Sequence, residues 1–186
     1  MGSALRPALV ATLLATALCG GLYPALVTLV AQVVFARQAN GSMIDGGGSE
    51  LLGQDNRDPR DFWSRPSATT RPYDASSSSG SNLGPSNPAL TAAARERVAL
   101  LRASDPGPHR PLPIDLVTTS ASGLDPHISP EAAHFQAPRV AQARGLALDR
   151  VDALIASVVE NRWLELFGQP RVNVGRLNRL LDRLGP

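Results

Sequence analysis

The chain has 186 residues, and its 18 basic and 16 acidic side chains leave a formal net charge of only +2 at neutral pH. Such a small excess, with few aromatic residues and no basic cluster around them, lacks the charge and stacking pattern of a nucleic-acid-binding protein. The sequence contains no lysine, which excludes a Walker A phosphate site, a protein-kinase site and a Schiff base. Its single cysteine, Cys19, excludes intrachain disulfides and thiolate zinc sites.

The first long segment, residues 7–35, contains no charged side chain. At about 1.5 Å per residue, a helix of this length exceeds the roughly 30 Å hydrocarbon core of a bilayer. We therefore predict a transmembrane anchor over residues 7–36, preceded by a tail of residues 1–6. A cleaved signal peptide is the alternative, since Ala15-Thr16-Ala17 has the form of a cleavage site, but the apolar run continues far beyond it.

Three residues inside this anchor favour a partner within the membrane. Gly20 and Gly21 are small enough to let another helix approach closely. Pro24 frees backbone groups that neighbouring helices commonly satisfy. We expect all three to contribute to helix packing in the bilayer.

The composition changes after the anchor. Residues 37–53 include Gly46-Gly47-Gly48-Ser49 and predict a flexible connector. Residues 54–186 have the length of one ordinary domain, so we expect a single soluble core. Near its start, Trp63 lies between Arg60 and Arg65, where it would either fill the core, which we favour, or stack on a ligand or partner.

Helix signals follow a serine-rich surface segment, residues 74–88. Asn87 is a good N-cap and Pro88 a good first helical residue, so we predict a helix to about residue 104. The β-branched residues 114–119 predict a strand. The remaining segments predict a helix from Ser129 to Gly145, a helix capped by Asp149 and ending near residue 162, two strand-like runs over 164–174, and a last helix capped by Asn173. The expected fold is one mixed α/β (α+β) domain behind a single membrane helix.

The most suggestive polar pair is Asp125 and His127, because an acid and an imidazole on a proline-bounded loop are suited to metal binding or proton transfer. Such a site needs further ligands or a nucleophile, and none has a defensible position in the sequence. We favour the simpler interpretation, in which Asp125 caps a turn and His127 bonds a backbone carbonyl. A membrane-tethered hydrolase or metal enzyme using this loop and a nearby serine remains the alternative.

The order of several unusual segments is more specific than any catalytic motif. Behind the single span come DPRDFWSRPSA at residues 58–68, GSNLGPSNP at 80–88, SGLDPHISP at 122–130 and GQPRVNV at 168–174. This arrangement resembles the C subunit of the bacterial Kdp potassium-transporting ATPase, over essentially the whole chain.

The resemblance implies a non-catalytic accessory subunit of an ATP-driven potassium importer. Its partners would be a channel-like potassium-selective subunit, an ATP-hydrolysing pump subunit and the bilayer. The family further implies a catalytic chaperone that promotes ATP use by the pump subunit, so ATP would be bound together with that subunit. The resemblance implies no tightly bound cofactor, no metal site and no catalytic residue in this chain. Within the matching blocks we expect these residues to bind partners or organise loops: Trp63, Arg65, Pro66, Ser67, Asn82, Gly84, Pro85, Asn87, Asp125, His127, Ser129 and Asn173.

The sidedness of the domain is not decided by charge, because Arg6 precedes the span and Arg37 follows it. A short tail before an apolar run has the form of an uncleaved signal anchor. We therefore expect a single-pass protein of the bacterial inner membrane with its N-terminus inside and its domain extracytoplasmic. Direct nucleotide contact, for which residues 151–162 are the nearest candidate, would instead require a cytoplasmic domain.

Overall fold

The computed structural model describes residues 4–44, 48–105, 107 and 110–184. The chain divides into two compact units, one ending at Met43 and the other beginning at Ile44. The second unit contains the candidate site.

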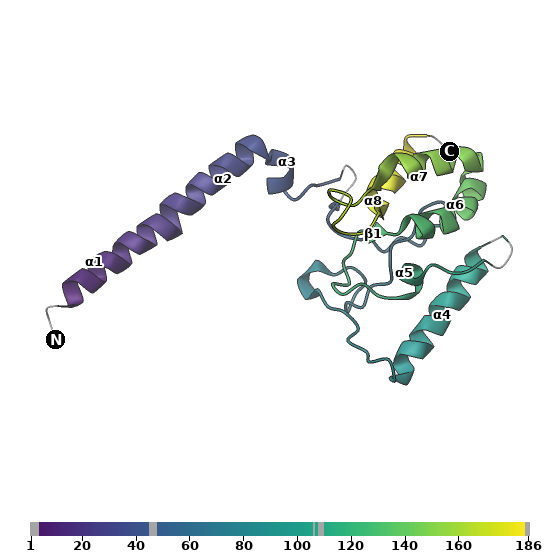
Figure 1. Ribbon diagram of the computed structural model, residues 1–186, viewed down its shortest axis with the longest axis horizontal. Coiled ribbons are helices and arrows are strands. Elements are labelled where there is room, and N and C mark those ends of the chain that lie inside the picture. Colours follow the sequence, from purple (N-terminus) through teal and green to yellow (C-terminus); the bar gives the residue numbers. More distant parts are fainter. Residues whose placement is uncertain (1–3, 45–47, 106, 108–109, 185–186) are drawn as a thin grey trace. The chain divides into compact units, whose positions relative to one another are not determined.

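The first unit is built on one continuous helix over Leu5–Val34, long and apolar enough to cross a membrane (purple to blue in Figure 1). It consists of α1 (Leu5–Ala15), the π-helical turns η1 (Thr16–Leu22) and α2 (Tyr23–Val34). The wider turns come just before Pro24, whose ring would crowd the carbonyl four residues earlier in a regular α-helix. The predicted N-terminal apolar helix is thus confirmed, and a short helix, α3 (Ala36–Ala39), follows it.

The second unit combines helices with a small sheet. The three strands are antiparallel in the order β1-β3-β2, so the last strand in sequence lies in the middle. This arrangement confirms the predicted α+β class (Figure 1). The elements are η2 (Ala75–Ser77), α4 (Pro88–Ser104), α5 (Ile114–Val117), β1 (His127–Ile128), α6 (Pro130–Arg144), α7 (Leu148–Val158), β2 (Val159–Glu160), β3 (Arg171–Asn173) and α8 (Val174–Asp182).

The core lies where α6, α7 and α8 meet the central strand β3. Alanines on the buried face of α6 allow close packing against it, while larger apolar side chains come from the other elements. The largest fully buried apolar residues are Phe62, Ile128, Val140, Val151, Ile155, Val172, Leu177 and Leu181.

Three predicted helix caps are confirmed. The side chain of Asn87 accepts a hydrogen bond from the N–H of Ala89, and Ser129 accepts one from Ala132. Asn173 accepts one from Arg176. Each cap satisfies an N–H group that the first helical turn leaves without a partner.

Two local predictions are wrong. Residues 114–117 form the single helical turn α5 instead of a strand, because Pro113 starts the turn and the Asp115 carboxylate holds the N–H of Ser129 at 2.6 Å. The next helix, α7, begins after Ala147, so Asp149 lies in its first turn and does not cap it. There its charge still complements the helix dipole.

The strand and helix ends near residues 158–174 also differ from expectation. Helix α7 stops at Val158, well before residue 162, because Val159 turns into strand β2. Of the expected strand-like runs over 164–174, the second forms β3, whereas the first lies in the loop of a β-hairpin between β2 and β3.

Part of the expected connector 37–53 belongs to the folded second unit. Ile44 is buried, and the N–H of Gly53 donates to the carbonyl of Leu124 at 2.8 Å. Asn173 donates from its side chain to the carbonyl of Glu50 at 2.7 Å. Residues 45–47 of that connector, in its glycine run, lie outside the described residues.

Candidate functional site

Two of the segments that carried the family resemblance meet in the second unit. The hydroxyl of Ser67 donates to the carbonyl of Gly123 at 2.7 Å, which joins the 58–68 and 122–130 blocks. The serine-rich segment joins them through the N–H of Ser79, which donates to the carbonyl of Ser122 at 2.9 Å. Gly123 lies at this junction with a φ of +69°, a conformation that favours glycine.

Arg65, Asp125 and His127 form a hydrogen-bonded cluster within this junction. One Asp125 oxygen accepts the N–H of His127 at 3.0 Å and lies 3.3 Å from its Nδ1, and the other lies 3.3 Å from Nη1 of Arg65. Burial raises the pKa of Asp125, but the hydrogen bonds from His127 and the charge of Arg65 outweigh it and hold that pKa below its ordinary value. The carboxylate is therefore ionised at neutral pH and caps the turn, while the His127 ring meets this carboxylate where we expected a backbone carbonyl.

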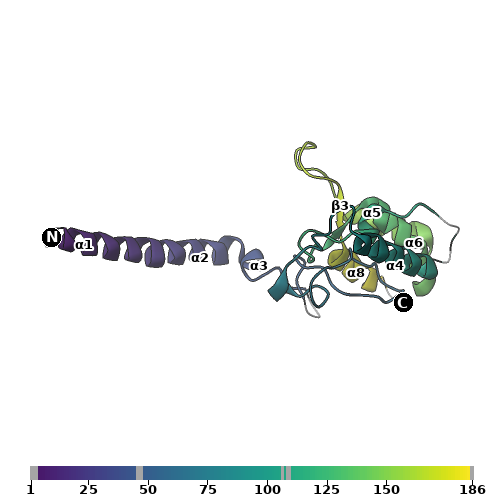
Figure 2. The same ribbon diagram turned by 90° about the horizontal axis from the view of Figure 1, so that it is seen from below.

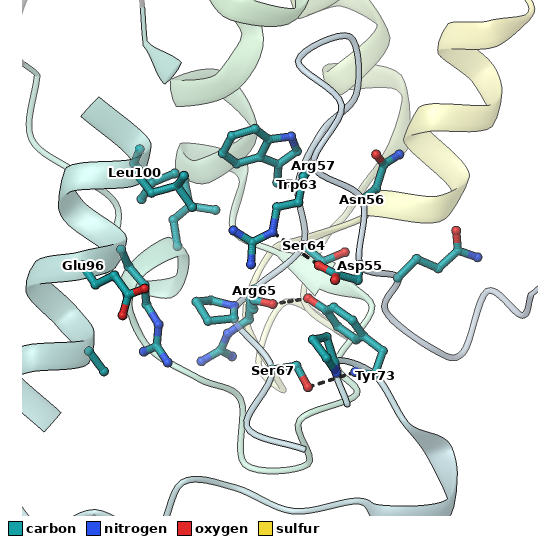
Figure 3. Close-up of a pocket in the computed structure, with 17 residues that line it drawn as sticks. Asp55, Asn56, Arg57, Trp63, Ser64, Arg65, Ser67, Tyr73, Glu96 and Leu100 are labelled. Atoms are coloured by element: carbon teal, nitrogen blue, oxygen red, sulfur yellow. Dashed lines mark hydrogen bonds and ion pairs between the residues drawn. The ribbon is translucent and has the colours of Figure 1, made fainter. Parts of the chain in front are cut away.

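A second cluster orders the loop that follows Arg65. Ser67 Oγ accepts the N–H of Tyr73 at 3.1 Å and lies 2.8 Å from the hydroxyl of Thr69. The Tyr73 hydroxyl donates to the carbonyl of Arg65, as the dashed lines of Figure 3 show. Burial raises the pKa of Tyr73 to about 12, so its phenol remains a hydrogen-bond donor at neutral pH.

Two serines close to the Asp125–His127 turn donate their hydroxyls to other groups. The Ser67 hydroxyl donates to Gly123, and the Ser129 hydroxyl donates to Asp115 at 3.1 Å. Among the described residues there is also no cluster of three or more His, Cys, Asp or Glu side chains suited to a metal ion. The hydroxyls of Ser67 and Ser129 thus hold the loop segments together.

A cavity of about 380 Å³ opens beside the junction (Figure 3). Its lining includes the predicted Trp63, Arg65, Pro66 and Ser67. Both charge signs are present, because three arginines, Arg57, Arg65 and Arg97, line it together with the carboxylates Asp55 and Glu96. Lining residues that we did not predict include Asp55, Arg57, Tyr73, Glu96, Arg97 and Leu100.

Trp63 belongs to the core, as we favoured. Its side chain is buried, its indole N–H donates to the carbonyl of Asp58 at 2.9 Å, and its backbone N–H donates to Gln136 at 2.8 Å. The guanidinium of Arg139 lies 4.3 Å from the ring centroid. The cation on the ring therefore comes from α6 and not from the neighbouring Arg60 or Arg65.

Helix α6 carries three buried polar residues, Gln136, Arg139 and Arg144, that were not predicted from the sequence. Arg139 donates to the carbonyls of Pro59 at 2.6 Å and Asp61 at 2.9 Å. Arg144 pairs with Asp61 at 2.5 Å and with Asp182 at 2.7 Å. The polar residues Gln136 and Arg139, three positions apart on an otherwise alanine-rich helix face, are the sequence pattern that could have indicated these buried contacts. Together they fasten the 58–63 segment to the core.

The other predicted residues lie outside this junction. Asn82, Gly84, Pro85 and Asn87 form the exposed approach to α4, where the Asn87 N–H donates to the carbonyl of Gly84 at 3.0 Å. Asn173 pairs with His127 between strands β3 and β1. Whether any of these residues binds a partner stays a prediction.

Gly20, Gly21 and Pro24 lie on the fully exposed helix of the first unit. A β-carbon added at Gly21 would meet no described atom within 4 Å. Their helix-packing role likewise stays a prediction.

Comparison with known proteins gives a match over nearly the whole chain. The family model described as "KdpC: K+-transporting ATPase, c chain" matches residues 5–183. The chain is similar to the potassium-transporting ATPase KdpC subunit of Polaromonas naphthalenivorans, with 55% identity over 100% of this chain and 97% of the relative. It is also similar to the subunits of that name from Methylococcus capsulatus, at 54% over 96% and 97%, and Herpetosiphon aurantiacus, at 52% over 96% and 95%.

Proposed function

The chain belongs to the KdpC family, the c chains of K+-transporting ATPases, and from this membership we propose that it is a non-catalytic accessory subunit of an ATP-driven potassium importer. It stabilises the assembled complex and promotes ATP use by the pump subunit. The observation that carries the proposal is the match of residues 5–183 to the family. Its partners are a channel-like potassium-selective subunit and an ATP-hydrolysing subunit.

The chemistry of the loop junction supports an accessory role over the alternative of a tethered hydrolase. Asp125 serves as an acceptor for His127 and Arg65, and the hydroxyls of Ser67 and Ser129 donate to other groups. A hydrolase would need one of these hydroxyls directed at the imidazole. We accordingly propose that ATP is handled by the pump subunit and that this chain holds no tightly bound cofactor.

Co-purification tests the proposal. A tagged full-length chain, expressed with the neighbouring subunits in a host that lacks its own complex, should bring down two larger membrane proteins with potassium-stimulated ATPase activity. The full-length chain purified alone in detergent should hydrolyse no ATP. Failure to recover the larger proteins, or turnover by the chain alone, would contradict the accessory role.

The substitution Asp125→Ala tests whether this carboxylate takes part in ATP hydrolysis. In complexes matched for subunit content, this variant should retain ATP hydrolysis, because the carboxylate organises a loop. Loss of hydrolysis without loss of subunits or stability would favour the hydrolase.

We further propose that the second unit is extracytoplasmic and acts on the pump indirectly, on the argument that the short tail and span form an uncleaved signal anchor. Protease added to intact spheroplasts should digest the chain beyond Arg37. Full protection, with cleavage of a known external protein as the control, would place the domain inside and favour direct contact with nucleotide.

A further inference from the structure

A hairpin loop projects from the second unit between strands β2 and β3. All nine residues from 161 to 169 are exposed. In Figure 2 this loop is the yellow extension that leaves the body of the domain beside β3. Nothing in the candidate site or in the core uses it.

The loop presents apolar side chains to solvent. Trp163 is 69% exposed, Leu164 66%, Leu166 76% and Phe167 60%. A single exposed leucine is ordinary on a protein surface, but four large apolar residues within five positions indicate an interaction site. We call residues 163–167 the apolar tip.

The apolar tip has a defined conformation. The backbones of Trp163 and Phe167 exchange hydrogen bonds of 2.9 and 3.0 Å, and their rings lie 5.7 Å apart between centroids. Leu164 and Glu165 both have positive φ, at 51° and 61°. Glycine or asparagine would adopt this turn at lower cost, so the leucine at the apex carries a backbone penalty. A preorganised aromatic anchor of this kind suits insertion into a preformed cleft.

The charges around the tip favour a protein over the bilayer as its partner. At the base of the hairpin, Arg171 pairs with Glu160 at 2.9 Å, and Arg162 donates to Gln169 at 3.0 Å. Arg162 meets a neutral amide and keeps its charge, but Glu165 at the apex carries the opposite charge. The hairpin thus has two arginines and two glutamates and no net basic charge to attract anionic lipid headgroups. At the apex, Glu165 has no ion-pair partner among the described residues, and a carboxylate there opposes insertion into hydrocarbon.

We propose that the apolar tip docks into an apolar cleft on another subunit of the same ATPase complex, with a basic side chain of that subunit facing Glu165. This inference rests on the proposed accessory role. Only nine residues lie between Val34, at the end of the apolar helix, and Ile44, where the folded unit starts, so the ten steps of chain limit the distance between their Cα atoms to about 36 Å. The cleft therefore lies on the part of a membrane-embedded subunit that emerges on the same side of the bilayer.

Photo-crosslinking in the assembled complex tests this contact. The amino acid p-benzoylphenylalanine in place of Leu166 should give, on illumination, an adduct with one larger subunit, identified by mass spectrometry. The same group in place of Arg95, on the exposed surface of α4, is the control. If the complex assembles but the probe at position 166 gives no more adduct with a larger subunit than the probe at position 95, the proposal is overturned. Adducts with lipid alone would overturn it too and assign the tip to the bilayer. If no complex forms with the unmodified chain, the accessory role fails instead.

A double substitution provides an independent measurement. Leu164→Ser with Leu166→Ser should lower the recovery of the larger subunits at least tenfold while leaving the thermal unfolding of the full chain unchanged, because both side chains are exposed. Leu148→Ser, at a residue 43% exposed on α7, should leave recovery unchanged. Glu165→Arg should also reduce recovery, and more than Glu165→Gln. Wild-type recovery with the double variant would overturn the proposal.

Discussion

Replacing Arg139 with methionine is expected to destabilise the second unit by about 2 to 4 kcal/mol, because several hydrogen-bond acceptors lose their charged donor and the Trp63 ring loses the cation above it. The guanidinium donates to the carbonyls of Pro59 and Asp61 and to the side chain of Gln136, and it covers the Trp63 ring. Methionine fills part of the space but removes the donor that the carbonyls of Pro59 and Asp61 share, while the Gln136 oxygen keeps only the N–H of Trp63. Burial lowers the pKa of Arg139 to about 10, so the side chain is still charged at neutral pH.

Urea denaturation of the full chain in detergent, followed by tryptophan fluorescence, measures this loss. Arg150→Met is the matched control, since Arg150 is exposed on α7, and should change the free energy of unfolding by no more than about 0.5 kcal/mol. Equal unfolding midpoints and slopes for the two variants would show that the α6 network does not hold the 58–63 segment.

Replacing Gly123 with alanine is expected to cost about 2 to 4 kcal/mol, within the range for a clash combined with an unfavourable backbone conformation. The new β-carbon would lie 2.6 Å from the carbonyl oxygen of Ser79 and 2.8 Å from Cγ2 of Thr69. The Ser79 segment cannot retreat easily, because its N–H is bonded to Ser122. The positive φ adds strain for any residue with a β-carbon.

Thermal unfolding and the yield of co-purified subunits should both report this change. The control is Gly84→Ala, in another block of the family resemblance, where an added β-carbon meets no described atom within 4 Å. That variant should behave like the wild type. Similar unfolding temperatures for Gly123→Ala and Gly84→Ala would refute the junction as a rigid element.

These expected effects suggest that different parts of the second unit serve stability and partner binding. The polar residues of the recognised blocks are occupied by one another, as in the contacts of Asp125 with Arg65 and His127. They hold three loop segments in one arrangement. The apolar tip of the hairpin, in contrast, presents exposed side chains that are available to a partner.

Features that depend on residues close together in the chain could be predicted from local sequence. An uncharged run of adequate length predicted the apolar helix, and Asn87, Ser129 and Asn173 predicted three helix starts, because a cap bonds an N–H only two or three residues away. The blocks that contain these three caps also carried the family resemblance.

Features that depend on contacts between residues far apart in the chain could not be predicted in this way. Residues 114–117 are helical where β-branched residues predicted a strand, since Asp115 must reach Ser129. Arg139 is buried because it meets Trp63, 76 positions earlier in the chain, through a contact that no local pattern encodes. The residues of the hairpin loop resembled a strand in isolation, and whether their apolar side chains are covered depends on what the rest of the fold places against them.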